Sequence, residues 1–403
     1  MNILHLIASA DPIHGGPIEG VMKTGAVWAS VGVTQTIASL DPPDAPFLND
    51  GLRQVVPLGA RNKVLKLVGR LMPLRRYGYT PGAVRWLREN APSFDVVIVN
   101  GVWNYASLAA ARAFKSSNVP FVVFTHGMLD PWFSEKYPWK HMFKKLHWRF
   151  AEGILLNRAA AVCFTTEEER CRARNQFVPY APIERVVGYG TAATPPLNES
   201  QESAVYAVVP EIRTKPHYLY LSRLHPKKGL DLLIRAFARA GTRDPNARLI
   251  IAGPDPLRMR GGLQSLAKSL GVDSRIAWLD MVTGDVKNGL LNLCEAFILP
   301  SHQENFGIAV AEALSASKPV LLSDKVNIWR EVKEDCAGFV ESDTVAGTER
   351  LFDRHQGLDA NDRSRMRENA RRCFASRFEI KNTAMQLLRD LERICSSSRG
   401  RPN

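Results

Sequence analysis

The segment HYLYLSRLHPKKGLDLLIRAF, residues 217–237, has the pattern of a strand, a turn and a helix in succession. Its beginning is a short run rich in Leu and Tyr, as expected of a buried strand. Pro226 and Gly229 then interrupt the run, and a helical pattern starts near Leu230. We interpret the segment as one βα unit, with Arg223 at the end of its strand.

Units of this kind recur along most of the chain. Short, nearly continuous apolar runs suit a parallel sheet that is buried on both faces. They form an early set at 2–8, 95–101, 120–127 and 161–166, and a later set at 217–224, 247–254, 275–280, 295–301 and 318–324. A Pro-, Ser- and Gly-rich stretch at 188–204 separates the two sets, and we interpret it as a linker. The sequence therefore predicts an α/β protein with two Rossmann-like, doubly wound domains and an interdomain cleft.

The pattern also predicts where the domains begin and end. We place the first domain at residues 1–190 and the second at 191–375. We expect a helix at 376–395 to return to the first domain and residues 396–403 to form a polar tail.

Composition restricts the class of protein further. The chain has 403 residues, of which 45% are hydrophobic, and a formal net charge of +13, which favours an anionic partner. Its six cysteines are scattered without a CxxC pair, so we expect neither disulfides nor a zinc site, and a reducing cytoplasm fits best. We expect no signal peptide, and no apolar segment of the sequence approaches the roughly 20 residues of a membrane span.

Ligands of open α/β sheets bind beyond the carboxyl ends of the strands, so residues just after strands deserve most weight. Arg223 follows a strand, and Lys228 lies in the turn before the next helix. A helix N-terminus favours anions, Arg grips phosphate oxygens with two N–H groups, and Lys adds a mobile charge. We interpret this turn as a diphosphate site; the alternative is a solvated basic turn.

The segment SHQENFGIAVAEALSASKP, residues 301–319, places two carboxylates after another strand. Glu304 lies in the loop, where the N–H groups of Phe306, Gly307 and Ile308 can meet it or a sugar hydroxyl. Glu312 lies eight residues later in a helix that is otherwise apolar, where a buried carboxylate needs a partner such as a ribose hydroxyl. The alternatives are an ordinary carboxylate at a helix N-terminus for the first and an ion pair with an Arg for the second.

Taken together, these segments resemble the C-terminal domain of glycosyltransferase family 4, whose members are retaining, use nucleotide sugars and have the GT-B fold. The resemblance covers essentially the whole chain and is strongest over 217–340. The E-x7-E motif of that family matches Glu304 and Glu312, and its phosphate-binding Arg and Lys match Arg223 and Lys228.

The resemblance implies a role for each matched residue. Glu304 would contact the donor sugar, aided by the amides of residues 306–308, and Glu312 would hold the ribose. Arg223 and Lys228 would neutralise the leaving diphosphate. The sequence departs from the family at two points: Ser222 replaces the usual Gly before the Arg, and GYG at 188–190 replaces the usual PNG.

The first domain contributes weaker candidates. Gly15 and Gly16 follow the first strand and let a substrate approach the backbone, although a plain turn before a helix explains them equally. His126 ends the strand at 120–127; the resemblance implies that it hydrogen-bonds the transferred sugar, and the alternative is a capping or core histidine. The segment HGMLDPW, 126–132, resembles exopolysaccharide and O-antigen glycosyltransferases, and we expect Asp130 to shape the acceptor side.

Two basic segments of the first domain have amphipathic helical spacing, at 61–76 and 134–150. Lys and Arg mixed with Trp and Phe suit a helix that rests on anionic lipid. We therefore expect peripheral binding to the cytoplasmic membrane and a saccharide acceptor linked to polyprenol. The alternative is a solvated helix whose apolar face packs on its own domain.

The predicted reaction transfers a sugar from a nucleoside diphosphate sugar to an acceptor hydroxyl, in the synthesis of a surface polysaccharide. Because Arg, Lys and a helix N-terminus can stabilise the leaving diphosphate, we expect no metal and no other cofactor. An epimerase or a phosphorylase of the same fold remains an alternative, as does a catalytically inactive scaffold. A basic nucleic-acid-binding protein is less favoured, since the chain has no recognisable nucleic-acid-binding motif, and we expect no nucleic-acid partner.

Overall fold

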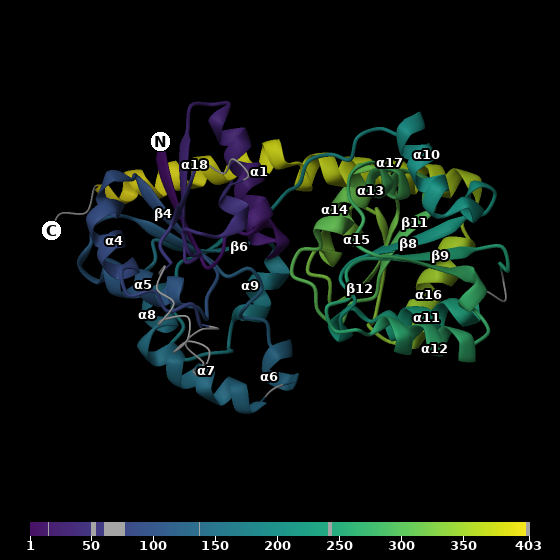
Figure 1. Ribbon diagram of the computed structural model, residues 1–403, viewed down its shortest axis with the longest axis horizontal. Helices are drawn as coiled ribbons and strands as arrows, with labels where there is room; N and C mark the ends of the chain where they lie inside the picture. Colours follow the sequence, from purple (N-terminus) through teal and green to yellow (C-terminus); the bar gives the residue numbers. More distant parts are fainter. Residues whose placement is uncertain (15, 50–53, 60–76, 137, 241–243, 400–403) are drawn as a thin grey trace. The chain divides into compact units, whose positions relative to one another are not determined.

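The computed structural model describes residues 1–14, 16–49, 54–59, 77–136, 138–240 and 244–399. The chain divides into two compact units, shown in Figure 1. Unit 1 contains Met1–Tyr189 and Ile380–Asn403, and unit 2 contains Gly190–Glu379. Each unit has its own parallel sheet with helices packed against it, so the predicted pair of Rossmann-like, doubly wound α/β domains is confirmed.

In unit 1 the described strands form one sheet in the order β3-β2-β1-β4-β5-β6-β7, and every neighbouring pair is parallel. The strands are β1 (Asn2–Ile7), β2 (Thr34–Ser39), β3 (Val55–Pro57), β4 (Val96–Asn100), β5 (Phe121–Phe124), β6 (Ala161–Phe164) and β7 (Glu184–Val186). The helices are α1 (Pro17–Ala29), α4 (Ala83–Asn90), α5 (Tyr105–Ala113), α6 (Trp132–Lys136), α7 (Pro138–Phe150), α8 (Glu152–Arg158), α9 (Glu167–Ala173) and α18 (Ile380–Arg399).

Both faces of this sheet are buried, which explains why most positions of its central strands are apolar. In β4, Val97 and Val99 pack in one hydrophobic cluster with α4, α5 and α8. The alternate residues Val96 and Ile98 pack in another cluster with α1 and α18. Successive side chains of a strand point to opposite faces, so a run without polar residues marks a strand covered on both sides.

The last helix belongs to unit 1. Trp28 of α1 is fully buried, and its Nε1 donates a hydrogen bond of 2.9 Å to the carbonyl oxygen of Ala384 in α18. This helix runs from Ile380 to Arg399, so it begins four residues after the predicted start and includes part of the predicted polar tail. Residues 396–399 are helical, so the prediction that they belong to a polar tail was wrong. Cys395, one turn before Arg399, is buried and extends the packed face of the helix.

In unit 2 the described strands form a parallel sheet in the order β10-β9-β8-β11-β12-β13. The strands are β8 (His217–Leu221), β9 (Arg248–Ala252), β10 (Ile276–Leu279), β11 (Ala296–Leu299), β12 (Val320–Ser323) and β13 (Gly338–Glu341). The helices are α10 (Glu199–Val208), α11 (Leu230–Ala240), α12 (Arg260–Ser269), α13 (Gly284–Leu293), α14 (Ile308–Ser315), α15 (Trp329–Glu334), α16 (Val345–Gln356) and α17 (Ala360–Cys373). The order reverses at β8, so the ends of β8 and β11 flank the switch point where ligands of such sheets bind.

The interpretation of 188–204 as a linker was wrong for its second half, where α10 begins at Glu199. The side chain of Asn198 caps this helix by accepting a hydrogen bond of 2.9 Å from the Gln201 N–H. Val205 is fully buried against α13, where Gly289 leaves room for its side chain. The Pro and Ser residues led to the prediction of a linker, whereas the helix is stabilised by its cap and by tertiary packing.

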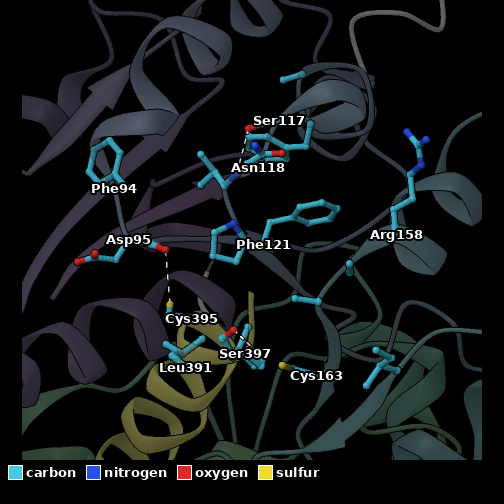
Figure 2. Close-up of a pocket in the computed structure, with 18 of the residues that line it drawn as sticks. Phe94, Asp95, Ser117, Asn118, Phe121, Arg158, Cys163, Leu391, Cys395 and Ser397 are labelled. Atoms are coloured by element: carbon cyan, nitrogen blue, oxygen red, sulfur yellow. Dashed lines mark hydrogen bonds between the residues drawn. The ribbon is translucent and has the colours of Figure 1, made fainter. Parts of the chain in front are cut away.

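Unit 1 also contains a cavity of ≈ 1610 Å³ at the amino ends of its strands (Figure 2). Asp95, just before β4, lines it together with Phe121 at the start of β5. In the lining of the cavity, the Cys395 thiol of α18 donates a hydrogen bond of 3.5 Å to the carbonyl oxygen of Asp95. The predicted site residues follow their strands instead, so this cavity lies at the opposite edge of the sheet from them.

Candidate active site

The basic turn of unit 2 is docked against the loop that follows β11. The backbone N–H groups of His302 and Gln303 donate to the carbonyl oxygen of Lys227, at 2.8 and 3.2 Å. Gly229 closes the turn in the left-handed region, with φ +65°, and a Cβ there would lie 2.1 Å from the Pro300 carbonyl oxygen. Only glycine satisfies both conditions, so its presence brings the turn and the loop together.

The docked turn places Lys228 in contact with Glu304. The Lys228 ammonium donates to the Glu304 carboxylate, and the lysine is 4% exposed. Burial opposes ionisation of Glu304 and is the largest influence on its pKa. The charge and the hydrogen bond of Lys228, with Lys227 nearby, outweigh it and hold this pKa below its ordinary value. Glu304 is therefore a carboxylate anion at neutral pH.

The backbone of the Glu304 loop is fixed on its other side by the segment after β12. The Glu304 N–H donates to the carbonyl oxygen of Lys325 at 3.0 Å, and the Glu304 carbonyl oxygen accepts from the Asn327 N–H at 3.1 Å. Gly307, with φ +79°, then turns the chain into α14, which begins at Ile308. The first N–H groups of a helix have no partner within the helix, so this turn presents donors beside Glu304.

Glu312 is buried in α14, as its apolar surroundings in the sequence predicted. Its Oε1 accepts a hydrogen bond of 2.8 Å from the Lys287 Nζ of α13. The ion pair anticipated as the alternative therefore exists, but with a lysine in place of an arginine. Sequence reasoning missed Lys287 because α13 and α14 are adjacent only in the folded unit.

The backbone on both sides of Arg223 is held by hydrogen bonds, although the Arg223 side chain is exposed. The Ser222 N–H donates to the Ala252 carbonyl oxygen at 3.1 Å, and the Leu224 N–H donates to the Pro254 carbonyl oxygen at 2.9 Å. Gly253 lies against Ser222, and a Cβ there would lie 2.0 Å from the Ser222 carbonyl oxygen. Ser222, one of the two departures from the family pattern, thus keeps the close backbone approach.

In unit 1, His126 follows β5 and joins a row of three polar side chains. Its Nε2 lies 3.2 Å from Oδ1 of Asn100, the last residue of β4. The Asn100 Nδ2 lies 3.2 Å from Nδ1 of His5 in β1. Burial lowers the pKa of His126 to about 4. Burial, followed by repulsion from His126 when that ring is protonated, lowers the pKa of His5 to about 3. Both imidazoles are therefore neutral at pH 7.

A buried carboxylate that sequence reasoning missed holds the loop on which His126 lies. Glu169 of α9 accepts at Oε1 from the Thr125 hydroxyl (2.7 Å) and the Gly127 N–H (2.6 Å). Its Oε2 accepts from the Thr165 N–H (2.8 Å) and hydroxyl (2.7 Å). The segment TTEEER in the sequence indicates only the start of a helix, because two partners of Glu169, Thr125 and Gly127, lie in the loop after β5.

Gly16 lies beside Tyr189, and Gly15 lies outside the described residues. The Tyr189 hydroxyl donates to the Gly16 carbonyl oxygen at 3.0 Å, and its ring meets the ring of His126 edge-on, with centroids 6.5 Å apart. Gly20 in α1 leaves the space that the Tyr189 hydroxyl occupies. The structure thus brings Gly16 and His126 to the same edge of the sheet, with Tyr189 between them.

Asp130 is buried and has protein partners of its own. Its Oδ2 lies 3.0 Å from the Arg172 Nε, and its Oδ1 accepts from the Trp132 N–H at 2.9 Å. These contacts give Asp130 a structural role in the loop after β5. The predicted contribution to the acceptor side remains a prediction.

The basic segment predicted at 134–150 forms α6 and α7, whereas the one at 61–76 lies outside the described residues. Helix α7 packs on its own unit through Trp148, which is fully buried and donates from Nε1 to the Pro179 carbonyl oxygen at 2.9 Å. None of the described helices is both long enough and apolar enough to cross a membrane.

Another face of α7 is exposed and apolar. We call it the α7 stripe: its residues recur every three or four positions, are between 53% and 76% exposed, and are Trp139, Met142, Phe143, Leu146 and Phe150. Lys145 and Arg149 are exposed on the same helix. The alternative, a helix whose apolar face packs on its own domain, therefore holds for Trp148 and not for the stripe.

Comparison with known proteins identifies the class. The chain matches the family model described as glycosyl transferases group 1 over residues 207–372, and the glycosyl transferase 4-like domain over residues 15–190. It is 24% identical to the alpha-D-kanosaminyltransferase of Streptomyces kanamyceticus, covering 89% of this chain and 95% of that one. It is 27% identical to the lipopolysaccharide 1,2-N-acetylglucosaminetransferase of Salmonella typhimurium, over 42% of this chain and 46% of that one.

Solved structures share the fold over nearly the full length. HepE from Anabaena, solved in complex with UDP, has a TM-score of 0.76 and 19% identity, covering 98% of this chain and 100% of that one. WaaG, a glycosyltransferase involved in lipopolysaccharide biosynthesis, has a TM-score of 0.66 and 16% identity, covering 98% and 99%.

Two doubly wound units that match these models over most of the chain define a glycosyltransferase of the GT-B class. The chain belongs to glycosyltransferase family 4, as the resemblance of its motifs implied. It is therefore an enzyme that transfers a sugar.

Proposed function

We propose that the enzyme transfers a sugar from a nucleoside diphosphate sugar to an acceptor hydroxyl with retention of configuration. The observation that carries the proposal is the Lys228–Glu304 contact at the carboxyl edge of the unit 2 sheet, beside the segment of Arg223. The contact joins a group suited to phosphate and a group suited to sugar hydroxyls in one place. Binding of UDP and of UDP-glucose by HepE supports a nucleotide-sugar donor.

In this reaction the diphosphate departs as negative charge builds on its oxygens. Lys228 and Arg223 oppose that charge, and the N–H groups at the start of α14 orient the donor. Glu304 accepts hydrogen bonds from the transferred sugar, and Glu312 accepts them from the ribose. Attack on the same face of the sugar, with the departing phosphate taking the acceptor proton, would give retention. The charges needed come from the protein, so the proposed reaction uses no metal ion.

A donor screen tests this proposal. Purified enzyme is incubated with UDP-, GDP- and ADP-sugars, and thermal shift and slow donor hydrolysis are measured. We expect one nucleotide class to raise Tm and to be hydrolysed. Loss of hydrolysis in Glu304→Ala with an unchanged circular dichroism spectrum would support the site. Tight binding to DNA without any response to nucleotide sugars would contradict the proposal.

We propose further that the acceptor is a saccharide linked to polyprenol, in the synthesis of a surface polysaccharide, and that the enzyme meets it at the inner face of the cytoplasmic membrane. The α7 stripe supports this location, because exposed Trp, Phe and Leu beside Lys145 and Arg149 suit the boundary between anionic headgroups and acyl chains. Each basic residue near such a surface contributes about 1 kcal/mol, so reversible binding is expected. The match to a lipopolysaccharide enzyme of Salmonella agrees with an acceptor of this kind.

Sedimentation with vesicles tests the location. We expect wild type to pellet with phosphatidylglycerol vesicles at low salt and not with phosphatidylcholine vesicles. Trp139→Ser with Phe143→Ser should reduce pelleting, and so should Lys145→Glu with Arg149→Glu. Leu257→Ser is the control, because Leu257 is likewise an exposed apolar residue, at 53%, but lies in unit 2. Pelleting that these α7 variants leave unchanged would contradict the role of the stripe.

A further inference from the structure

The orientation of the Asn100 side-chain amide is fixed by its neighbours. Its Nδ2 lies 3.4 Å from the Leu6 carbonyl oxygen and 3.3 Å from the Ile98 carbonyl oxygen. Backbone carbonyls only accept hydrogen bonds, so the atom facing them must be the NH₂ group. The Asn100 Oδ1 must therefore be the atom that faces His126.

This orientation determines which nitrogen of His126 carries the proton. An amide oxygen only accepts, so the His126 Nε2, 3.2 Å away, must be the donor. A neutral imidazole carries one N–H, so Nδ1 keeps its lone pair. The neutral state follows from burial, which lowers the pKa of His126 to about 4.

We propose that Asn100 is a positioning residue that holds His126 as the Nε2–H tautomer, so that His126 Nδ1 accepts a hydrogen bond from a hydroxyl of the transferred sugar. The identity of that hydroxyl rests on the proposed function, whereas the tautomer does not. His126 is thereby an acceptor, whereas a protonated or Nδ1–H imidazole would be a donor at the same atom.

His5 completes the arrangement from the other side of the amide. Its Nδ1 accepts from the Asn100 Nδ2 at 3.2 Å, and its ring lies 6.0 Å from that of the buried Trp28. Three described neighbours of His126 are uncharged at pH 7: His5 across the amide, the Phe124 ring stacked at 5.6 Å, and the Tyr189 ring edge-on. The Glu169 carboxylate bonds the residues on either side of His126, Thr125 and Gly127. Because burial raises the pKa of the Tyr189 phenol, that group also stays protonated.

The first test is spectroscopic and needs no donor. Long-range ¹H–¹⁵N correlation of histidine-labelled full-length protein at pH 7 reports the tautomer of each imidazole. We expect His126 as neutral Nε2–H in wild type and as a tautomer mixture in Asn100→Ala. Gln35→Leu is the matched control, because Gln35 is a buried amide of the same unit that bonds the Val21 carbonyl oxygen, and its loss should leave His126 unchanged. A wild-type Nδ1–H or imidazolium form, or an unchanged tautomer in Asn100→Ala, overturns the proposal.

The second test is kinetic. Asn100→Ala should lower kcat by roughly ten- to a hundredfold, which is the scale expected when one hydrogen bond to a sugar hydroxyl is lost. KM for the donor should change little. In a His126→Ala background the same substitution should have almost no further effect. Equal losses in both backgrounds would show that Asn100 acts through the fold, which overturns the positioning role.

Asn100→Asp serves as the second variant, since it keeps the size of the side chain. Its carboxylate would favour the imidazolium form of His126, so activity should fall at pH 6 and recover partly at pH 8. A pH profile identical to that of wild type would contradict the proposal. Failure of every donor would remove the proposed function but leave the measured tautomer as an independent result.

Discussion

Lys228 and Glu304 contact each other across a separation of 76 residues, because two loops at the carboxyl edge of the unit 2 sheet are joined by backbone hydrogen bonds. One residue precedes α11 and the other precedes α14, so the pair links the two connections that flank the switch point of the sheet. A ligand with both phosphate and hydroxyl groups can bind the two partners at once.

Replacing Lys228 with Ala should lower kcat by about 10²- to 10³-fold, because the charge on the leaving diphosphate loses a preorganised cation. The donor Kd should change less, since this charge is largest in the transition state. Steady-state kinetics and isothermal titration with the nucleotide measure the two effects. Lys227→Ala in the same turn is the matched control, because the Lys227 Nζ bonds Gln303 at 3.1 Å. Equal losses in both variants would remove the special role of Lys228.

Glu312→Ala should weaken binding of the free nucleotide by roughly tenfold or more, which is the usual scale for a hydrogen bond to a charged group. Lys287→Met should lower Tm, since it leaves a buried carboxylate without its cation, yet it should keep nucleotide binding within a few-fold. Titration calorimetry and thermal unfolding separate these outcomes. If both variants weakened the nucleotide equally, the ion pair rather than the Glu312 carboxylate would be the feature that matters.

Transfer activity should persist after dialysis against EDTA, because Arg223, Lys228 and the start of α14 provide the positive potential at the leaving group. The measurement compares kcat before and after dialysis, and again after Mg²⁺ or Mn²⁺ is added back. A strict requirement for either ion would contradict the metal-free reaction.

Both units should lose stability as the pH falls from about 6.5 towards 4. Burial lowers the pKa of His126 in unit 1 to about 4, and burial followed by the charge of Lys318 lowers that of His217 in unit 2 to about 4. The unfolded chain takes up these protons near the ordinary histidine value of 6.5 while the native units do not, so acid favours unfolding. Each such group contributes up to about 1.4 kcal/mol per pH unit in this range.

Denaturant unfolding at pH 7.5 and pH 5 measures this loss. His217→Gln should reduce the dependence on pH for unit 2 and leave that of unit 1 unchanged. The same slope in both proteins would show that His217 does not carry it.

The sequence was sufficient for the residues that follow strands, since apolar runs mark where strands end and ligand groups come next. Arg223, Lys228 and Glu304 were placed after their strands in this way, and their binding roles stay predictions. The sequence did not indicate Asn100 or Lys287, because their partners come from other strands and helices. It also did not indicate α10, because the Pro and Ser residues before and within that segment are typical of a linker. Local pattern predicts elements and their edges, whereas pairing across the fold depends on packing.

Glu169→Gln should disturb the loop that carries His126, although the substitution changes a single atom. The carboxylate accepts four hydrogen bonds, two at each oxygen, from Thr125, Gly127 and Thr165. An amide keeps one oxygen and turns an N–H donor towards a backbone N–H, either that of Gly127 or that of Thr165. Each donor left without an acceptor costs about 1–3 kcal/mol, so Tm should fall. We also expect kcat to fall, because His126 is no longer held.

Hydrogen exchange distinguishes this effect from general destabilisation. The Gly127 amide should exchange faster in Glu169→Gln, whereas amides in the core of β4 should keep their protection. Glu168→Gln, the neighbouring residue on α9, is the matched control and should retain wild-type Tm, kcat and exchange. An unchanged Gly127 exchange rate with normal kcat would show that the loop is held by other contacts, and Glu169 would then have no positioning role.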